Sequence, residues 1–427
     1  MTERKNALEV LSRRGLIEWC SQPEELSSLF EREMVTGYVG FDPSADSLHV
    51  GNMVPIMGLA WLQRLGHRPM ALVGGGTGLI GDPSGKTKER QLLSEEQVVH
   101  NMGCIRGQLE RFLDFDRTPN AALLVNNYDW LKKQGYIEFL RDTGKYFSVN
   151  YMINREYIRS RLEDPEKSIT YTELSYMLLQ AFDFHHLYRT QGCLLQMGGN
   201  DQQGNLIAGI DLIRKKEGVQ AYAATFPLLL TSSGQKFGKS EQGAVYLSPE
   251  RTSPYRFYQF WINTEDADLP KLLRMYTFWE DEEIGALLAE QAAAPERRTG
   301  QKRLAWDFTC RVHGEEVAKR VARASELLFG EFDLSRLDAQ VLETLVDEIP
   351  TAPLPGDLPR SLADLLAESG ACPSKGEAKR LLKGGGVSCN GRKVEREDAA
   401  VEPSELLFDR YLFLRLGKKR FHLLRRG

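Results

Sequence analysis

The sequence predicts an α/β protein in which a domain with a mostly parallel sheet precedes an α-helical domain and a small α+β domain. In the first half, short apolar runs of β type alternate with helical patterns, which is typical of a parallel sheet covered by helices. Residues 253–332 have an almost entirely helical pattern, and a proline-rich stretch, residues 349–359, comes soon after them.

The composition is that of an ordinary globular protein. The chain has 427 residues, of which 42% are hydrophobic, and this length is enough for two or three domains. No run of about 18 apolar residues predicts a membrane span, and the first residues have no apolar signal core. The cysteines are not spaced as a zinc-binding pair, and no other metal-ligand cluster is evident. We therefore expect a cytoplasmic protein that binds no membrane and holds no metal of its own.

Five segments of the first half have a clear pattern. Residues 68–73, 122–125 and 193–197 are short apolar runs and are predicted to be strands. Residues 51–65 and 171–184 have apolar residues at helical spacing and are predicted to be helices. Strands that alternate with helices in this way form a sheet whose strands are mostly parallel.

The second half is predicted to be helical and then to contain a linker. Residues 284–293 and 315–328 have the pattern of helices. The prolines of residues 349–359 stiffen the chain and disfavour both helix and sheet, so this stretch is interpreted as a linker. The predicted segments are a domain of residues 1–230, a helical domain of residues 231–335, a linker of residues 336–358 and a terminal domain of residues 359–427.

The terminal domain is predicted to contain two short helices and a hairpin. The helices, residues 361–369 and 374–383, each begin with a serine, which is well suited to capping a helix. In VSCNGRKV, residues 387–394, the pair Asn390-Gly391 stands between residues of β type and predicts a two-residue hairpin turn.

Several cations of this domain are candidates for binding an anionic partner. Three lysines of the second helix recur at i, i+4 and i+8, so they form one stripe and repel one another. One interpretation is a solvated face; the other is a surface for RNA, whose phosphates supply the missing counter-charge. The candidate RNA-binding residues are Lys375, Lys379, Arg380, Lys383, Arg392 and Lys393.

A glycine-rich segment follows the predicted strand at 68–73. It matches the GxGxxG pattern of dinucleotide-binding proteins and nearly matches a phosphate-binding P-loop. A P-loop needs four residues between its glycines, but only three separate Gly81 from Gly85. A dinucleotide site should open directly into a long helix, but here Asp-Pro-Ser-Gly predicts a turn. We therefore interpret the segment as flexible backbone that approaches a ligand closely and presents Asp82.

Two segments far apart in the sequence indicate a nucleotide site. Asp46 or Ser47 is predicted to cap a helix. The first turns of that helix contain His49, Gly51 and Asn52, and a helix N-terminus attracts phosphate. Residues 234–240, GQKFGKS, carry a lysine pair that could neutralise a pyrophosphate leaving group. Taken alone, the first pattern is common by chance, and the second fits two solvated surface lysines.

Together, the two segments resemble the HIGH and KMSKS signatures of class I aminoacyl-tRNA synthetases in their order and separation. Asn52 stands where the first signature has its second histidine, and Phe237-Gly238 replace Met-Ser in the second. Asparagine keeps a side-chain donor, so we expect the contact with phosphate to survive the replacement.

A third pattern concerns the substrate. Tyr176, Gln180 and Asp183 lie at i, i+4 and i+7 and thus share one face of the predicted helix at 171–184. A polar face usually meets water, but residues 174–182 carry no charge, so we expect this face to be buried and to need partners. A bound amino acid would supply an ammonium group for Tyr176, Gln180 and Asp82. Its side-chain hydroxyl would pair with Asp183.

Nearly the whole chain resembles the bacterial type of tyrosyl-tRNA synthetase, which is a class I aminoacyl-tRNA synthetase. The resemblance implies a Rossmann-like catalytic domain and a C-terminal domain similar to the S4 type of RNA-binding module. The motifs that carry it are residues 38–43 (YVGFDP), 74–84, 171–184, 195–205 (LQMGGNDQQGN) and 236–240.

The resemblance also implies roles for individual residues. Those expected to bind tyrosine are Tyr38, Asp82, Tyr176, Gln180, Asp183, Gln196 and Gln202. Those expected to bind ATP are Gly40, Asp42, His49, Gly51, Gly199, Asp201, Lys239 and Ser240. Those expected to stabilise the transition state at phosphorus are His49, Asn52, Lys236 and Lys239.

The implied activity joins L-tyrosine to ATP and then to the 3′ end of tRNA(Tyr). ATP is a substrate, Mg²⁺ accompanies it, no prosthetic group is expected, and residues 128–161 are expected to form a homodimer. A tryptophanyl enzyme of the same class would share the nucleotide motifs but would not need Asp183 and Tyr38 aimed at a phenol. An RNA-binding protein with an inactive nucleotide domain is the alternative from another class.

Overall fold

The computed structural model describes residues 5–82, 93–164, 168–240, 243–329, 337–417 and 420–427, and the chain divides into two units. The first unit contains Met1–Thr252 and Thr264–Leu304. The second unit contains Ser253–Asn263 and Ala305–Gly427. The chain therefore leaves the first unit, contributes one helix to the second, and returns.

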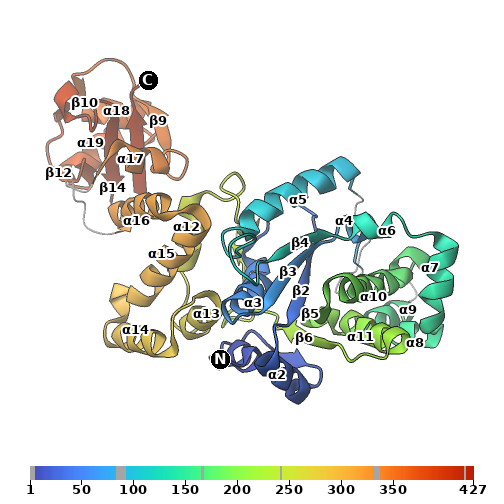
Figure 1. Cartoon of the computed structure of the whole chain (residues 1–427). Helices are drawn as coiled ribbons and strands as arrows, with labels where there is room; N and C mark the ends of the chain where they lie inside the picture. Colours follow the sequence, from blue (N-terminus) through green and yellow to red (C-terminus); the bar gives the residue numbers. More distant parts are fainter. Residues whose placement is uncertain (1–4, 83–92, 165–167, 241–242, 330–336, 418–419) are drawn as a thin grey trace. The chain divides into compact units, whose positions relative to one another are not determined.

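A six-stranded sheet forms the centre of the first unit (Figure 1). Its strands lie in the order β1-β6-β5-β2-β3-β4, and all neighbours are parallel except β1 and β6. The strands are β1 (Trp19–Cys20), β2 (Thr36–Phe41), β3 (Arg68–Val73), β4 (Leu123–Asn126), β5 (Cys193–Gly199) and β6 (Tyr222–Phe226). This arrangement confirms the predicted α/β fold class with a mostly parallel sheet.

The three strands predicted from the sequence are all present. The strand at 68–73 is confirmed as β3, and those at 122–125 and 193–197 are observed as β4 and β5 with slightly shifted ends. Their apolar runs are continuous rather than alternating because strands of a parallel sheet are covered on both faces.

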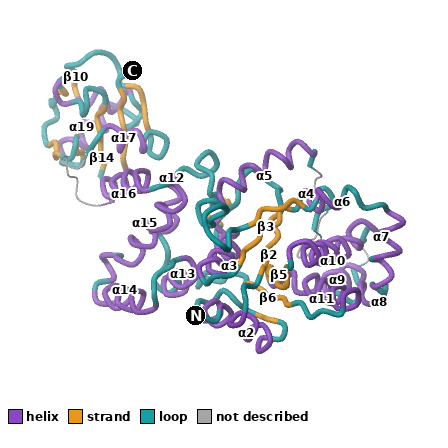
Figure 2. Tube along the Cα trace, viewed as in Figure 1, coloured by secondary structure: helices purple, strands orange, loops and turns teal. Residues whose placement is uncertain are grey.

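Helices cover both faces of this sheet (Figure 2). Gly37 and Tyr38 are neighbours on β2, so they point to opposite faces. A Cβ atom at Gly37 would lie 3.2 Å from Leu62 on α3 (Met53–Arg64). The ring of Tyr38 lies 5.5 Å from that of Phe184 on α10 (Tyr171–Gln191), against which α11 (Gln203–Glu217) packs.

The two helices predicted in this half are present, with different ends. The helix predicted at 51–65 begins as a 3₁₀ turn, Val50–Asn52, which continues into α3. The helix predicted at 171–184 extends to Gln191, where Gly192 ends it in the left-handed conformation at φ 63°. The other helices of the unit are α1 (Ala7–Arg13), α2 (Pro23–Arg32), α4 (Gly75–Gly78), α5 (Glu95–Leu109), α6 (Tyr128–Leu131), α7 (Tyr136–Asp142), α8 (Val149–Ile153), α9 (Glu156–Leu162), α13 (Leu269–Tyr276) and α14 (Asp281–Ala293).

One buried arginine fastens the returning segment to the first unit. The guanidinium of Arg14, next to α1, donates to the carbonyls of Arg274, Thr277 and Trp279 at 3.1, 3.2 and 2.6 Å. It also lies 3.8 Å from the centre of the Trp61 ring on α3. Carbonyls at the end of a helix attract a cation, and here they compensate for the burial that lowers the pKa of Arg14 to about 10.

The second unit begins with helices that share an aromatic core. Its helices here are α12 (Pro254–Ile262), α16 (Glu315–Phe329) and α17 (Ala339–Leu345), and α15 (Thr299–His313) has residues in both units. The rings of Trp261 and Phe308 lie 4.5 Å apart, and Phe257 packs beside both. The helices predicted at 284–293 and 315–328 are confirmed as α14 and α16.

The rest of the second unit is an α+β domain. Its five-stranded sheet has the order β12-β11-β14-β15-β9. Asn390 and Gly391 both have positive φ between β11 and β12, so the predicted hairpin is confirmed. The elements are β9 (Thr351–Pro353), β10 (Arg360–Ser361), α18 (Leu362–Glu368), α19 (Lys375–Lys383), β11 (Val387–Cys389), β12 (Arg392–Val394), β13 (Ala400–Val401), β14 (Tyr411–Leu416) and β15 (Arg420–Arg425).

The proline-rich stretch is not free of regular structure, contrary to the expectation from its composition. Residues 351–353 form β9, which pairs in parallel with β15 at the edge of the sheet. An edge strand tolerates proline because one side of its backbone needs no partner. Helix α17 also lies inside the predicted linker. Of the two serines predicted as caps, Ser374 accepts a hydrogen bond from the amide of Glu377, and Ser361 caps no amide.

Among the described helices, none combines the length and the apolar character that crossing a lipid bilayer requires.

Close packing of α3 on the sheet depends on Gly58. A methyl group there would lie 2.5 Å from Cε1 of Phe226, a buried ring on β6. We expect Gly58→Ala to lower the free energy of unfolding by about 1–3 kcal/mol, as measured by urea denaturation. Gly285→Ala in α14 is the control, because no described atom lies within 4 Å of that Cβ position; it should stabilise by roughly 0.5–1 kcal/mol. An unchanged stability of Gly58→Ala would contradict this packing.

Candidate active site

A cavity of about 540 Å³ opens at the carboxyl ends of the parallel strands β2 and β5. In open α/β sheets, ligands bind at this edge, where the chain runs from one strand to helices on either face. Thirteen of the candidate residues line it: Tyr38, Gly40, Asp42, His49, Asn52, Asp82, Tyr176, Gln180, Asp183, Gln196, Gly199, Asp201 and Gln202. The structure thus brings together residues from 38 to 202 that the sequence keeps far apart.

Tyr38 and Asp183 are both buried in the wall of the cavity, each about 2% exposed. The Tyr38 hydroxyl has no hydrogen-bond partner among the described residues. Burial raises the pKa of Tyr38 well above its usual value, and the nearby charge of Asp183 raises it further. Burial also raises the pKa of Asp183 to about 7. Tyr38 therefore offers a buried donor and Asp183 a buried acceptor in the wall of the cavity.

Two donors that the sequence analysis missed hold the Asp183 carboxylate. Asn127 Nδ2 donates to Oδ2 at 2.8 Å, and Trp130 Nε1 donates to Oδ1 at 2.7 Å. Both bonds favour the ionised form and so partly oppose the effect of burial on the pKa. The Trp130 ring also stacks on His186 at 4.4 Å. The sequence pattern that could have identified them is the run of polar residues directly after the predicted strand at 122–125. Such positions lie at the carboxyl ends of the strands, where parallel sheets bind their ligands.

Asn127 also holds the glycine-rich segment. Its Oδ1 accepts from the amide of Gly76 at 2.7 Å, and its Nδ2 donates to Thr77 Oγ1 at 2.8 Å. A Cβ atom at Gly75 would lie 2.2 Å from Asn126 Oδ1, so only glycine allows this approach to β4. The segment forms the short helix α4 and packs against β4, and its close approach to a ligand stays a prediction.

The candidate residues for an amino group form a second part of the wall. Gln202 Nε2 donates to Asp82 Oδ2 at 2.7 Å. Asn205, which the sequence analysis did not select, donates from Nδ2 to Gln180 Oε1 at 2.9 Å and to Gln202 Oε1 at 3.3 Å. Burial and the charge of Asp82 raise the pKa of Tyr176 well above its usual value. Hydrogen bonds therefore link Asp82, Gln202 and Gln180 through the buried Asn205, and Tyr176 lines the same cavity.

Two glycines, Gly40 and Gly199, also line the cavity. The Cβ position of Gly40 has no described atom within 4 Å, so a ligand can lie directly against this backbone. A Cβ atom at Gly199 would lie 2.6 Å from Asp201 Oδ1, so glycine lets that carboxylate fold back over the end of β5. Asp42, at the end of β2, lines the same region.

The prediction that Asp46 or Ser47 caps a helix is wrong. The helical turn is Val50–Asn52, its cap is His49, and the Asn52 side chain accepts from the His49 amide at 3.0 Å. Ser47 has its hydroxyl bonded to the carbonyl of Leu48, and Asp46 is paired with Arg251. A Cβ atom at Gly51 would lie 2.8 Å from Cε1 of His49, so glycine is needed for the imidazole to fold over the turn.

The two segments predicted to bind nucleotide lie against each other. Gly238 has φ 90°, and a Cβ atom there would lie 2.9 Å from the amide nitrogen of Gly51. The amide of Val245 donates to the carbonyl of Gly238 at 3.0 Å, and that of Val50 donates to Val245 at 2.8 Å. Residues 49–52 and 236–240 are therefore joined by backbone hydrogen bonds through residue 245.

Not every candidate lies in the cavity wall. Gly51 and Lys236 are not among the described residues that line the cavity, and Lys236 is exposed. The backbone of Lys239 and Ser240 forms the short strand β7, which pairs with β8 (Gly243–Ala244), but their side chains lie outside the described part of the chain. The roles of these four residues stay predictions, as do those of the candidates that line the cavity.

The burial of Asp183 has a measurable consequence for stability. The folded protein holds the Asp183 proton more tightly than the unfolded chain, whose carboxyl has its usual pKa of 3.8. The tighter binding of this proton therefore stabilises the folded protein fully at low pH. This stabilisation is lost as the pH rises through about 7. We expect Asp183→Asn to remove that decline when urea denaturation is repeated between pH 4 and 8. Asp129→Asn, at an exposed position, controls for net charge; an unchanged slope in Asp183→Asn would contradict the raised pKa.

Two family models match the chain. The model of class I tRNA synthetases for tryptophan and tyrosine matches residues 31–330. The model of the C-terminal domain of tyrosine–tRNA ligases matches residues 341–424.

Similar proteins are found both among curated sequences and among solved structures. The tyrosine–tRNA ligase of Anaeromyxobacter dehalogenans is 50% identical and covers 99% of both chains. That of Opitutus terrae is 49% identical and covers 98% of this chain and 99% of its own. The structure of a truncated mitochondrial tyrosyl-tRNA synthetase of Aspergillus nidulans has a TM-score of 0.69 and 31% identity, and covers 76% of this chain and 95% of its own. The chain therefore belongs to the tyrosine–tRNA ligases, a family of class I tRNA synthetases.

Proposed function

We propose that the cavity binds L-tyrosine and ATP, forms tyrosyl-adenylate, and passes tyrosine to the 3′ end of tRNA(Tyr). Membership of the tyrosine–tRNA ligase family supports the reaction. One observation supports the choice of amino acid: Asp183 and Tyr38 are buried together in the cavity wall. A phenol hydroxyl satisfies both, because it donates one hydrogen bond to a carboxylate and accepts another from a hydroxyl.

Selectivity follows from the same two groups. Phenylalanine would leave the Tyr38 hydroxyl unpaired and would remove one hydrogen bond from the Asp183 carboxylate; an unpaired buried group costs about 1–3 kcal/mol. A loss of about 1.4 kcal/mol corresponds to a tenfold lower rate or affinity. The indole N–H of tryptophan donates but does not accept, so it would leave Tyr38 unpaired. Asn127 and Trp130 fix the carboxylate so that it does not turn away from the substrate.

The substrate ammonium group is proposed to bind Asp82, Tyr176 and Gln180. Asp82 supplies the opposite charge. The hydrogen bond from Gln202 Nε2, at 2.7 Å, holds the Asp82 carboxylate in place for the ammonium group. The bond from Asn205 Nδ2 occupies one lone pair of Gln180 Oε1 and leaves the other for the ligand. Gln196 lies in the same wall, and its buried Oε1 has no hydrogen-bond partner among the described residues.

ATP is proposed to occupy the end of the cavity with the exposed glycine backbone. Gly40 allows close approach of the nucleotide, Asp42 lies beside it, and Gly199 with Asp201 would bind the ribose. His49 and Asn52 would donate to the phosphates from the wall. Three residues of the neighbouring loop at 236–240 are proposed to reach the phosphates: Lys236, Lys239 and Ser240. Gly51 is proposed to shape the contact between this loop and the cavity.

The first step is an attack of the tyrosine carboxylate on the α-phosphorus of ATP, which releases pyrophosphate. In the second step the terminal ribose hydroxyl of the tRNA attacks the carbonyl carbon of the tyrosyl-adenylate, which forms the ester, gives up the hydroxyl proton and releases AMP. The proposed mechanism assigns catalysis to positioning and to stabilisation of charge at phosphorus by donors on the wall. Mg²⁺ is proposed to arrive with the nucleotide, because it usually binds substrate phosphates with a few carboxylates and waters; among the described residues, no group of three acidic, histidine or cysteine side chains is arranged to hold a metal.

The terminal domain is proposed to bind the tRNA through its exposed cations. Three of the six candidates already have acidic partners: Lys375 with Asp364 at 2.5 Å, Lys383 with Glu397 at 3.5 Å and Lys393 with Glu395 at 2.7 Å. The other three have no acidic partner among the described residues and are Lys379, Arg380 and Arg392. These three can meet phosphates without giving up an ion pair, so they should contribute more to RNA affinity.

A homodimer through residues 128–161 is also proposed. Large apolar side chains are exposed there: Tyr136 is 63%, Ile137 73% and Val149 62% exposed. Large apolar side chains in water favour association, because a second copy would remove them from water. The cytoplasmic location stays a prediction.

Amino-acid-dependent exchange of labelled pyrophosphate into ATP tests the proposal. We expect exchange with tyrosine and none above background with phenylalanine or tryptophan. Asp183→Ala should abolish exchange because the substrate hydroxyl loses its acceptor. Asp211→Ala is the control, since Asp211 lies on α11 outside the cavity and pairs with Arg214. Exchange with tryptophan, or near-normal tyrosine kinetics in Asp183→Ala, would remove the proposed hydroxyl-reading role.

The terminal domain is tested by two triple variants. The first variant combines Lys379→Ala, Arg380→Ala and Arg392→Ala. It should weaken tRNA(Tyr) binding, and the slope of log affinity against log salt should fall by roughly one for each phosphate that is no longer bound. The matched variant replaces the three cations that have acidic partners, and it should weaken binding less. Pyrophosphate exchange without tRNA should be unchanged in both. If neither variant alters the affinity or its salt dependence, the proposed RNA surface is wrong.

A further inference from the structure

Helix α5 contacts the segment that leads from β2 into the nucleotide side of the cavity. Residues 43–48 connect β2 to His49, and Ser44, Ala45, Ser47 and Leu48 line the cavity. This segment is neither helix nor strand, so its own backbone hydrogen bonds do not fix its path. Another part of the protein must therefore hold it in place.

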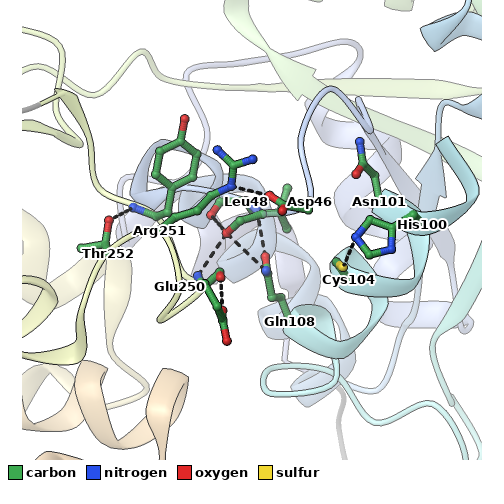
Figure 3. A network of polar contacts seen from close by, with 12 residues as sticks. Asp46, Leu48, His100, Asn101, Cys104, Gln108, Glu250, Arg251 and Thr252 are labelled. Atoms are coloured by element: carbon green, nitrogen blue, oxygen red, sulfur yellow. Dashed lines mark hydrogen bonds and ion pairs between the residues drawn. The ribbon is translucent and has the colours of Figure 1, made fainter. Parts of the chain in front are cut away.

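Two amide side chains of α5 supply these contacts. Asn101 Nδ2 donates to the carbonyl of Pro43 at 2.7 Å. Gln108 Oε1 accepts from the amide of Leu48 at 2.8 Å, as Figure 3 shows. Asn101 and Gln108 are two helical turns apart, so they lie on one face of α5 and hold the segment at both ends.

Gln108 also takes part in a group of hydrogen bonds around the Ser47 hydroxyl, called the Ser47 junction below. Ser47 is buried, and its hydroxyl donates to the carbonyl of Leu48 at 2.7 Å. The same oxygen accepts from Gln108 Nε2 at 3.2 Å and from the amide of Ser248 at 3.0 Å. Both the donor and the acceptor capacity of this hydroxyl are therefore used.

The junction joins the two segments that carry the nucleotide motifs. The amide of Leu247 donates to the carbonyl of Leu48 at 2.9 Å, and His49 pairs with Tyr246. From there the chain runs back through Val245 to Gly238, which lies against Gly51. A shift of residues 47–48 would thus move both His49 and the loop of residues 236–240.

We infer that Asn101 and Gln108 are positioning residues for tyrosine activation, which act by holding residues 43–48 and the attached His49 in the geometry for phosphate transfer. This inference rests on the proposed function. Neither side chain lines the cavity among its described residues, so the two act through the segment that they hold. Gln108 has the larger effect, because it bonds both Leu48 and the Ser47 junction.

The test measures kcat and KM of pyrophosphate exchange in Gln108→Ala and Asn101→Ala. We expect kcat to fall by a factor on the order of 10 to 100 in Gln108→Ala, because a small misplacement of reacting groups has that effect. The KM for tyrosine should stay unchanged, since Tyr38, Asp82 and Asp183 are held by other residues. Asn101→Ala should have the same pattern with a smaller loss of kcat.

A conservative variant and a double variant separate positioning from a structural role. Gln108→Glu keeps an acceptor for the Leu48 amide and loses the donor to Ser47, so its kcat should lie between those of wild type and Gln108→Ala. The double variant Gln108→Ala, Ser47→Ala should have a smaller fold-loss of kcat than the product of the two single fold-losses. Both substitutions remove the same hydrogen bonds around the Ser47 hydroxyl. Arg106→Ala is the control on α5: its side chain is exposed, pairs with Glu110, and should leave kcat and KM unchanged.

The outcomes are distinguishable from failure of the proposed function. A wild-type kcat in Gln108→Ala would overturn the inference, and so would a fall in kcat matched by a lower melting temperature and a raised KM for tyrosine. A fall in kcat at unchanged melting temperature and tyrosine KM supports it. If the wild-type protein has no tyrosine-dependent exchange, the proposed function fails and the inference fails with it.

Discussion

The buried carboxylate of Asp183 is the constraint on which the site depends. Removing a charged group from water costs several kcal/mol unless donors replace the lost hydration. Asn127 and Trp130 supply two such donors, and their own positions then require the glycine-rich segment to pass close to β4. The rest of the carboxylate faces the cavity. Burial thus raises the pKa of this carboxyl to about 7 in the wall of the cavity, where the hydroxyl of the proposed tyrosine substrate would complete its hydrogen bonding.

Much of this arrangement could be predicted from the sequence, because the local pattern of apolar and charged residues indicates which strands and helix faces are buried. The continuous apolar run at 68–73 marks a strand covered on both faces, and the uncharged stretch around Tyr176 and Asp183 marks a polar face that is not solvated. Asn127 and Asn205 could not be found in the same way. Their partners Asp183 and Gln180 lie 56 and 25 residues away in the sequence, and no periodicity encodes such contacts. The cap at His49 was also missed, since Ser47 is a good capping residue whose hydroxyl is taken by the Leu48 carbonyl.

Several glycines act here through the space they leave and not only through flexibility. Gly51 leaves room for the ring of His49, Gly238 for the backbone of Gly51, and Gly75 for the side chain of Asn126. At Gly75 and Gly238 a single added carbon would separate two segments that lie in contact, and at Gly51 it would displace the imidazole of the same turn. The sequence identifies such glycines as candidates for close contact, but only the structure tells which neighbour needs the space.

The contact of Arg14 with carbonyls near residue 277 has a consequence for how the chain is made. The partners of this guanidinium lie 260 to 265 residues later in the sequence. During synthesis the first helix is therefore complete long before its anchor exists, and helix α12 of the second unit emerges before the first unit can close. Contacts of such separation slow folding, because a long loop must be closed before they form. The nascent chain accordingly carries an unfinished first unit at least until residue 279 has left the ribosome.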